Sequence, residues 1–463
     1  MFSTTDTIVA IATPPGRGGI GVVRLSGPDA HAIAQSLVTH NGPLQPRHAT
    51  LTKVRLKPDG TEAATGPTVR LNPRTTGIDA IDQVVVTYFP APASYTGEDV
   101  VELSAHGSPV VLRAIVNAAI GRGARLAEPG EFTLRAFLNG RIDLMQAEAV
   151  NDLIDAATPL QARAAFDQLD GTLTRAIAGI DATLFDLIAR LEASVDFPEE
   201  GYHFVEPGAL AQAIDELLER SSALLGDARR GRLIREGLQI AIVGEPNVGK
   251  SSLFNALAGA SRAIVTDVPG TTRDLVTEVV DIEGLRVTLV DTAGLRDTDD
   301  PVEIEGVARA QQAIAVADLV LRVEDRSRPR SGGGADVSDR KVLYVANKMD
   351  LTPAWTDDRF VPVSATTGAG LDELRRRIVG ALDVDPLRDR PAMTNVRHIA
   401  LVDRAHQALG RARTATLGEG GSLSEEFVLA DLTEARAAFE EISGRRAPED
   451  LLEHIFSRFC IGK

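Results

Sequence analysis

The sequence predicts a multidomain protein that combines α+β and α/β folds, with a doubly wound α/β domain inserted into a helical domain. Three observations support this prediction. The 463 residues are more than one hydrophobic core usually organises. Short β-branched runs give way to Ala- and Leu-rich stretches near residue 131, and then to alternating strands and helices near residue 233. Helical character returns after residue 386, so the second part of the helical domain follows the inserted domain.

The N-terminal region, residues 1–130, is expected to be an α+β domain. Its β-branched runs predict strands at residues 20–25 and 83–89. An apolar pattern predicts a helix at residues 109–119, and Gly and Pro residues mark the turns between these elements.

The first helical segment, residues 131–232, carries one long apolar stripe. Its apolar residues recur at spacings of three and four from Leu169 to Val195, which predicts one face of a long helix. Pro198 and Gly201 are expected to end that helix. The core of a helical bundle explains such a stripe better than a ligand site does.

The inserted domain, residues 233–385, contains apolar runs of buried-strand length, which predict a doubly wound parallel sheet. The runs lie at residues 238–243, 285–290, 319–323, 342–346 and 360–363. In the last segment, residues 386–463, helices are expected at residues 424–442 and from Pro448 to the vicinity of Phe459.

Charge and cysteine content exclude several classes of protein. The formal net charge of -16 argues against a general nucleic-acid coat, so any RNA contact must use a local basic patch or a partner. The single cysteine, Cys460, permits neither an intrachain disulfide nor a four-cysteine metal site, which indicates a reducing cytosol. No secretory signal and no membrane-spanning stretch is recognisable, so a cytoplasmic protein is expected.

A Gly-containing segment, GEPNVGKS from Gly244 to Ser251, follows a predicted strand and opens a helix. This context is typical of a phosphate-binding loop, in which backbone N–H groups and the helix N-terminus surround the phosphates. Lys250 is expected to neutralise the β and γ phosphates, and Ser251 is expected to bind Mg²⁺. By itself the segment would also suit a nucleotide-binding ATPase.

Further motifs identify the nucleotide as GTP. The run Asp291-Thr-Ala-Gly294 follows a second strand, where an Asp holds Mg²⁺ through water. The run Asn347-Lys348-Met349-Asp350 follows another strand. Its Asp350 carboxylate can accept both N–H donors of guanine, a pair that adenine lacks. The residues expected to contact GTP are Asn247, Val248, Gly249, Lys250, Ser251, Ser252, Thr266, Asp267, Val268, Pro269, Gly270, Thr271, Thr272, Asp291, Thr292, Ala293, Gly294, Asn347, Lys348, Asp350, Ser364 and Ala365.

The residue types alone leave the hydrolytic group open. Ras-like GTPases carry a water-orienting Gln just after Asp-x-x-Gly, but this chain has Leu295 there. An acidic residue of the following segment is therefore expected to act. The candidates are Asp297, Asp299, Asp300, Glu303 and Glu305. Asn247, with backbone carbonyls of residues 266–271, can bind a monovalent cation that supplies the charge of an arginine finger.

The chain resembles the MnmE (TrmE) family of bacterial tRNA-modification GTPases over essentially its whole length. The resemblance depends on the nucleotide motifs, on the Gly-rich N-terminus from Asp6 to Gly19, and on the terminal Phe459-Cys-Ile-Gly-Lys463. Shorter matches are Tyr95-Thr-Gly-Glu-Asp99, Pro129-Gly-Glu-Phe132, Arg135-Ala-Phe-Leu-Asn139 and Gln146-Ala-Glu-Ala149.

Membership of that family would imply a folate-binding and dimerising N-terminal domain and an inserted Ras-like G domain. It would imply a homodimer that modifies C5 of wobble uridine 34 in certain tRNAs with a carboxymethylaminomethyl or aminomethyl group. The resemblance further implies that the FAD protein MnmG (GidA) shares the work in a heterotetramer. A 5,6,7,8-tetrahydrofolate derivative would donate the one-carbon unit.

The resemblance also implies roles for individual residues. It places Mg²⁺ at Ser251 and Thr272, K⁺ at Asn247, Thr266, Val268 and Thr271, and the folate at Arg24, Glu102, Arg141 and Lys463. Glu303 matches the family's catalytic glutamate. Cys460 stays open between a transient nucleophile and a small apolar side chain that packs at a helix end.

An Era- or Der-like ribosome-assembly GTPase, or a scaffold that only responds to nucleotide, would share the G motifs. No KH-type Gly-x-x-Gly loop and no second G domain is recognisable, which disfavours the ribosome factor. Neither the tRNAs that are modified nor the nitrogen source, glycine or ammonium, follows from the sequence. Arg322 and Glu324 stand in a strand that is more apolar in the family. A Gly-rich loop, residues 326–340, follows this strand, and the sequence assigns it no role. We expect the packing of this loop to differ from that in the family.

Overall fold

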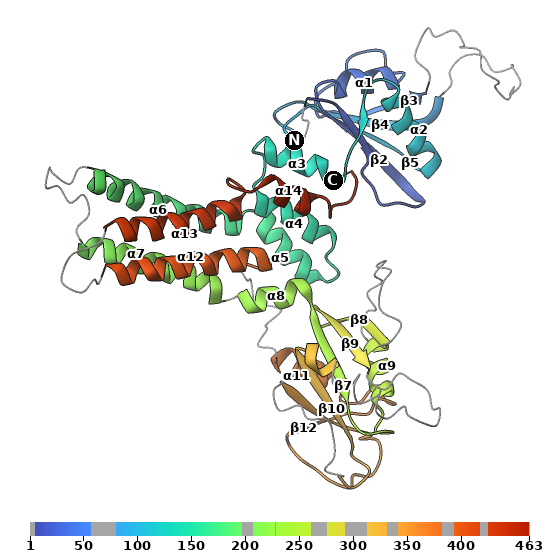
Figure 1. Ribbon diagram of the computed structural model, residues 1–463. Helices are drawn as coiled ribbons and strands as arrows, with labels where there is room; N and C mark the ends of the chain where they lie inside the picture. Colours follow the sequence, from blue (N-terminus) through green and yellow to red (C-terminus); the bar gives the residue numbers. More distant parts are fainter. Residues whose placement is uncertain are drawn as a thin grey trace, which may run out of the picture. The chain divides into compact units, whose positions relative to one another are not determined.

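The computed structural model describes most of the chain. The described residues are 5–56, 80–196, 207–226, 228–260, 276–291, 313–330, 341–381, 393–416 and 425–462. They form two compact units, the first from residues 1–148 and 443–463 and the second from residues 149–442. Each unit is described by itself (Figure 1).

The first unit is built on a six-stranded sheet with the order β3-β4-β5-β2-β1-β6. The strands are β1 (Ile8–Ile11), β2 (Gly18–Ser26), β3 (Thr50–Arg55), β4 (Ala80–Phe89), β5 (Val100–Gly107) and β6 (Arg125–Leu126). All pairs are antiparallel except β1 with β6. The predicted strands at residues 20–25 and 83–89 are confirmed as parts of β2 and β4.

Helices cover parts of both faces of this sheet. The helices α1 (Ala30–Leu37) and α2 (Pro109–Ile120) bury apolar side chains such as Leu37 and Ile115 in the main core, and α2 confirms the helix predicted at residues 109–119. On the other face, Phe132 of α3 (Glu131–Leu138) packs with Ile8 and Ala10 of β1.

The C-terminal residues belong to the first unit. The helix α14 (Glu449–Phe456) contacts α3, and the following residues reach β1. Pro129 forms an isolated β-bridge with Ile461, and a Cβ at Gly462, whose φ is 98°, would overlap the Ile11 carbonyl. The helix ends before Phe459, earlier than predicted, because the chain turns there to pack the Phe459 ring on the Phe456 ring.

The second unit contains a bundle of long helices (Figure 1). Its helices are α5 (Pro159–Leu169), α6 (Thr172–Asp196), α7 (Pro207–Gly226), α8 (Ala228–Glu236), α12 (Val396–Ala415) and α13 (Glu425–Ser443), and α4 (Leu144–Ile154) spans the division between the units. The predicted helix at residues 424–442 is confirmed as α13. Within the described residues, no helix combines the length and apolar character that a membrane span requires.

The apolar stripe from Leu169 to Val195 was predicted as one helix, and that prediction is wrong at its start. Leu169 ends α5, and a turn at Asp170 and Gly171, with a φ of 84° at Gly171, precedes α6. The spacing of four residues from Leu169 to Leu173 continues across the turn, so periodicity alone hides it. The predicted stop at Pro198 and Gly201 lies outside the described residues.

The α/β part of the second unit has a sheet with the order β12-β11-β10-β7-β9-β8. Its strands are β7 (Leu238–Val243), β8 (Val276–Ile282), β9 (Leu285–Asp291), β10 (Leu319–Asp325), β11 (Val342–Asn347) and β12 (Phe360–Pro362). The helices α9 (Lys250–Ala260) and α11 (Leu371–Ala381) pack on one face, where they share a core with the strands.

The five predicted strands are confirmed, but the sheet is not wholly parallel. β8, which the sequence analysis missed, pairs antiparallel with β9. The two-residue turn Glu283-Gly284 joins them, with φ values of 53° and 89°. Positive φ at both positions is typical of a tight hairpin turn, and Gly284 supplies the conformational freedom.

Arg322 and Glu324, two of the polar residues of β10, are half-buried and lie beside the described part of the loop that follows. The Arg330 Nε donates to Glu324 Oε2 at 2.9 Å. The same guanidinium lies 4.9 Å from the Trp355 ring centroid and 4.6 Å from that of Phe360. The loop thus packs on the sheet through one arginine, and residues 331–340 lie outside the description.

Candidate functional site

The loop between β7 and α9 has the backbone of a phosphate-binding loop. Gly244 has a φ of 154°, and a Cβ there would overlap the Val323 carbonyl of β10. Asn247 has a φ of 66° and Gly249 a φ of 93°. A Cβ at Gly249 would overlap the Asn347 side chain, so the loop needs glycine at this position because another element approaches closely.

Lys250 begins α9 and turns back over the loop. Its Nζ donates to the carbonyl oxygens of Gly244 and Glu245, at 2.9 Å each. Ser251 and Ser252 follow in the first turn and are exposed. The first turn of a helix has N–H groups without intrahelical partners, which favours an anion there. The loop therefore combines a cation, exposed hydroxyls and a helix N-terminus.

Asn347 connects the phosphate loop to the loop after β12. Its Nδ2 donates to the Val248 carbonyl at 2.9 Å, and its Oδ1 accepts from the Ala365 N–H at 3.1 Å. Its side chain is buried. Ser364 is fully buried, and its Oγ accepts from the Thr367 N–H at 3.2 Å. The residues predicted to recognise the base are thus assembled at the edge of the sheet where the phosphate loop lies.

Lys348 and Asp350 complete this edge. Lys348 has a φ of 65°, and its Nζ donates to the Asn247 carbonyl at 3.0 Å. The same Nζ lies 2.6 Å from Asp325 Oδ2, a contact that the sequence analysis missed. A signal was available, because Asp325 ends β10 as Asp291 ends β9. Asp350 is exposed, as a carboxylate that receives an incoming base must be.

Several predicted site residues lie outside the description. They are Thr266, Asp267, Val268, Pro269, Gly270, Thr271, Thr272, Thr292, Ala293, Gly294, Glu303 and Lys463. Only the backbone of Asp291 is described. Asp291 ends β9, and in the parallel pairing of β9 with β7 it stands opposite Ile242, the penultimate residue of β7. The motif that begins at Asp291 therefore starts beside the phosphate loop.

In the first unit, Arg24 and Glu102 face each other across β2 and β5. The Arg24 Nε donates to Glu102 Oε1 at 2.9 Å, and its Nη1 donates to the Gly462 carbonyl at 3.3 Å. The guanidinium carbon lies 5.6 Å from the Tyr95 ring centroid and 5.7 Å from that of Phe132. Two of the predicted folate residues and the C-terminal tail therefore meet at one place.

Arg141 lies against the same turn as Tyr95. A Cβ at Gly97 would stand 3.2 Å from Arg141 Cγ, so the glycine leaves room for the arginine stem. The Arg141 side chain is exposed. Tyr95 Oη and Thr133 Oγ1 share a hydrogen bond of 2.9 Å, which fixes the turn on α3.

A buried ionic network lies next to the turn that carries Tyr95 and Gly97. Arg135 is 1% exposed, and its Nη2 lies 2.9 Å from Glu131 Oε1 and 2.6 Å from Asp6 Oδ1. Its Nη1 lies 3.2 Å from Glu98 Oε2. Burial raises the pKa of Glu131, but hydrogen bonds from Arg125 and Arg135 outweigh burial and hold that pKa below its ordinary value.

Cys460 is exposed, and its carbonyl accepts from the Gly130 N–H at 3.4 Å. The tail that carries it is held by Pro129 and Arg24. The thiol therefore stands at the surface of the first unit, on the segment that carries Gly462 to Arg24.

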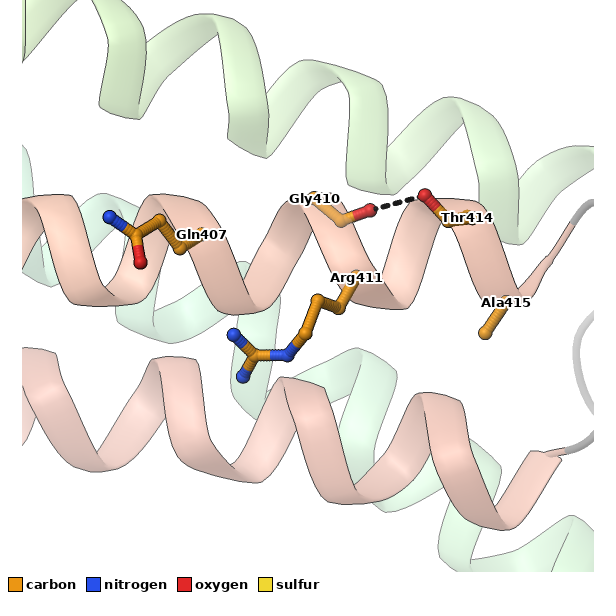
Figure 2. A pocket seen from close by; sticks show the side chains of 5 residues that line it. All are labelled: Gln407, Gly410, Arg411, Thr414 and Ala415. Carbon is orange, nitrogen blue, oxygen red and sulfur yellow. Dashed lines mark hydrogen bonds between the residues drawn. The ribbon is translucent and has the colours of Figure 1, made fainter.

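A shallow pocket lies elsewhere, on α12 (Figure 2). It is lined by Gln407, Gly410, Arg411, Thr414 and Ala415. Arg411 is held by Asp431 and Glu434 of α13, at 2.9 and 2.6 Å. No residue predicted to bind a ligand lines this pocket, and its arginine is already paired.

Two family models match the chain. The model of the MnmE helical domain matches residues 144–460, and the model of the GTP-binding protein TrmE N-terminus matches residues 7–141. Together they extend over both units.

Curated relatives are similar over the full length. The "tRNA modification GTPase MnmE" of Thermus thermophilus is 43% identical over 458 residues, which cover 99% of each chain. The proteins of that name from Koribacter versatilis and Symbiobacterium thermophilum are 43% and 44% identical, again over 99% of each chain. A crystal structure of Aquifex aeolicus Era bound to GDP and AlF4⁻ is 30% identical, with a TM-score of 0.25 over 37% of this chain and 66% of that one.

Proposed function

The chain belongs to the MnmE family of tRNA modification GTPases, and from that premise we propose that it hydrolyses GTP to modify tRNA. In the proposed reaction, the chain works with the FAD protein MnmG at C5 of wobble uridine 34. The group added is carboxymethylaminomethyl or aminomethyl, and a tetrahydrofolate derivative supplies the one-carbon unit. The proposed setting is the cytoplasm.

The observation that best supports GTP as the ligand is the position of Asn347. One amide side chain joins the phosphate loop at Val248 to the base-side loop at Ala365. A nucleotide with its phosphates at Lys250 would then extend its base toward Asp350. There the exposed carboxylate can accept the two N–H donors of guanine.

The described residues fit the proposed metal ions. Ser251 offers an exposed hydroxyl in the first turn of α9, as a Mg²⁺ ligand beside the phosphates must. Asn247 stands in the loop with positive φ, and an amide oxygen there suits a monovalent cation. The further ligands are proposed as Thr272 for Mg²⁺ and Thr266, Val268 and Thr271 for K⁺. The ions would stabilise the charge that develops on the phosphates.

Glu303 is the proposed group that orients the attacking water, and Lys250 stabilises the phosphates. The sequence offers no recognisable arginine finger. We therefore propose that the α/β domain of a second copy of the chain closes the K⁺-binding loop, residues 266–271, so that the homodimer takes part in hydrolysis. The proposed domains are residues 1–130, 131–232, 233–385 and 386–463. The heterotetramer with MnmG is proposed to bring the FAD to the tRNA.

The first unit fits a folate through the residues around Arg24. The Arg24 guanidinium lies near the Tyr95 and Phe132 rings, and this combination suits a folate, which has a planar ring system and a glutamate tail with carboxylates. Glu102 holds the guanidinium in place, and Arg141 with Lys463 is proposed to meet the glutamate tail. When bound, the folate would supply a one-carbon unit near Cys460.

Two measurements test the proposed function. The purified chain should hydrolyse GTP and leave ATP intact. Mass spectrometry of wobble uridine should show that a strain lacking this gene loses the C5 group and regains it when the gene is restored. Unchanged wobble uridine together with accumulated ribosomal subunits would favour a ribosome-assembly GTPase instead.

A further inference from the structure

Asp325 is a buried carboxylate in the nucleotide-binding edge of the sheet. It ends β10, which lies between β7 and β11 in the sheet order. The phosphate loop follows β7, Asn347 ends β11, and Lys348 comes directly after that strand. Because the carboxyl ends of parallel strands meet at one edge, Asp325 stands between the two motifs that bind nucleotide. Its side chain is 7% exposed.

The two carboxylate oxygens of Asp325 have separate partners. Oδ1 accepts from the Ser327 N–H at 2.9 Å and from Ser327 Oγ at 2.6 Å. Oδ2 accepts from Lys348 Nζ at 2.6 Å. The Trp355 Nε1 donates to the Asp325 carbonyl at 3.1 Å, which fixes the backbone as well. This carboxylate is therefore held in one orientation, with one oxygen presented to Lys348.

The contact continues into the phosphate loop. Lys348 Nζ also donates to the carbonyl of Asn247, the loop residue with a φ of 66°. One ammonium thus joins a carboxylate at the end of β10 to a peptide of the phosphate loop. A lysine has several rotatable bonds, and fixing them costs about 2 kcal/mol of side-chain entropy. A buried anionic partner offsets that cost before the nucleotide arrives.

We propose that Asp325 is a positioning residue for guanine-nucleotide binding, which acts by holding the Lys348 ammonium against the phosphate loop. The proposal rests on the GTP site proposed above. Asp325 does not touch the nucleotide; it preforms the loop at Asn247. Lys348 is the closest cation to Asp325 Oδ2, at 2.6 Å, whereas the Arg328 Nε lies 3.8 Å from the same oxygen.

A double-mutant cycle tests this proposal in the full-length protein. We expect Asp325→Asn to raise the Kd for GDP about tenfold, which is about 1.4 kcal/mol. The KM for GTP should rise similarly while kcat at saturating GTP stays within about twofold, because the lost interaction serves the bound ground state. Asp325→Glu should recover part of the affinity.

Combining Asp325→Asn with Lys348→Met shows whether Asp325 affects GDP binding through Lys348 or independently of it. If Asp325 acts through Lys348, the double variant should bind GDP at least as well as Lys348→Met alone. If the affinity loss of the double variant equals the product of the two single losses, the proposal is overturned. An unchanged Kd in Asp325→Asn would overturn it as well. Asp357→Asn is the matched control. Asp357 is another paired carboxylate, in the segment before β12, where it contacts Arg330 and Arg359, and its loss should leave the Kd unchanged.

Two outcomes separate this proposal from the proposed function. If the wild-type protein binds no guanine nucleotide, the GTP site itself is wrong. If the wild type binds GDP and the cycle is multiplicative, only the role of Asp325 is wrong. Should Asp325→Asn fail to fold, Ser327→Ala removes the 2.6 Å bond to Oδ1 and should weaken GDP binding in the same direction; an unchanged Kd in a folded Ser327→Ala would then overturn the proposal.

Discussion

Arg24 on β2 and Glu102 on β5 are direct partners across the sheet, and their side chains are joined at 2.9 Å. The Arg24 guanidinium also donates to the Gly462 carbonyl and lies near the Tyr95 and Phe132 rings. One charged side chain therefore organises the proposed folate site, the sheet and the C-terminal tail together.

Replacing Arg24 should weaken folate binding. Arg24→Ala removes a charge-assisted contact, so the Kd for a tetrahydrofolate should rise on the order of 10–100-fold by calorimetric titration. GTP hydrolysis should be unchanged. Arg113→Ala on α2 is the control, because it removes an exposed arginine of the same unit whose Nε bonds to the Pro109 carbonyl, away from Glu102 and Gly462. Equal folate affinity in both variants would contradict the site.

Potassium should stimulate GTP hydrolysis and sodium should do so far less, because a carbonyl and amide cage built for K⁺ is too wide for Na⁺. Asn247→Ala should remove most of the K⁺ effect, on the order of tenfold or more. The measurement is the hydrolysis rate across matched KCl and NaCl concentrations. Asn255→Ala, an exposed position of α9, serves as control. Equal rates in both salts would refute the cation site.

Glu303→Ala should lower the hydrolysis rate by roughly 10²–10⁴-fold while GTP affinity stays nearly constant, since water orientation acts in the transition state. Single-turnover hydrolysis and nucleotide titration measure the two quantities. Asp297→Ala and Glu305→Ala are the matched controls from the same acidic segment. If either control variant loses the hydrolysis rate and Glu303→Ala does not, the water-orienting residue is the one replaced in that control.

Cys460→Ser separates a nucleophile from a packing residue. The thiol is exposed, so serine keeps its size with little change in packing. If the thiolate reacts, wobble-uridine modification should vanish while GTP hydrolysis and dimerisation persist. Near-normal modification would make Cys460 dispensable for chemistry. The tail would then matter through Gly462 and Lys463.

Glu131→Gln should destabilise the first unit by about 3 kcal/mol, because it leaves Arg135 buried with one carboxylate fewer. The folded pKa of Glu131 lies below its ordinary value of 4.5, so its stabilisation is present above that pH and is lost as pH falls through the folded pKa. Hydrogen exchange of α3 amides from pH 6 to 3 measures this. Protection in the wild type should fall more steeply than in Glu131→Gln; parallel curves would count against the ionic role.

The sequence predicts local motifs better than their connections. The phosphate loop, the Asn347 run and five strands of the α/β sheet follow from spacing and strand context. The turn at Gly171 does not, because two helices can continue one apolar period. The partnership of Asp325 with Lys348 joins residues 23 positions apart, one at the end of β10 and one just after β11, and no local pattern encodes it.

The meeting of Arg24 with Gly462 joins residues 438 positions apart, which constrains when the first unit can be completed during translation. The ribosome synthesises the sheet of this unit first and Gly462 much later, after the residues of both the bundle and the α/β sheet. Until Gly462 is synthesised, the Arg24 guanidinium lacks this carbonyl acceptor. A chain that stopped before Gly462 could form its nucleotide loop, yet the Arg24 guanidinium would lack this carbonyl acceptor. The first unit is thus completed by residues that are synthesised after the whole of the second unit.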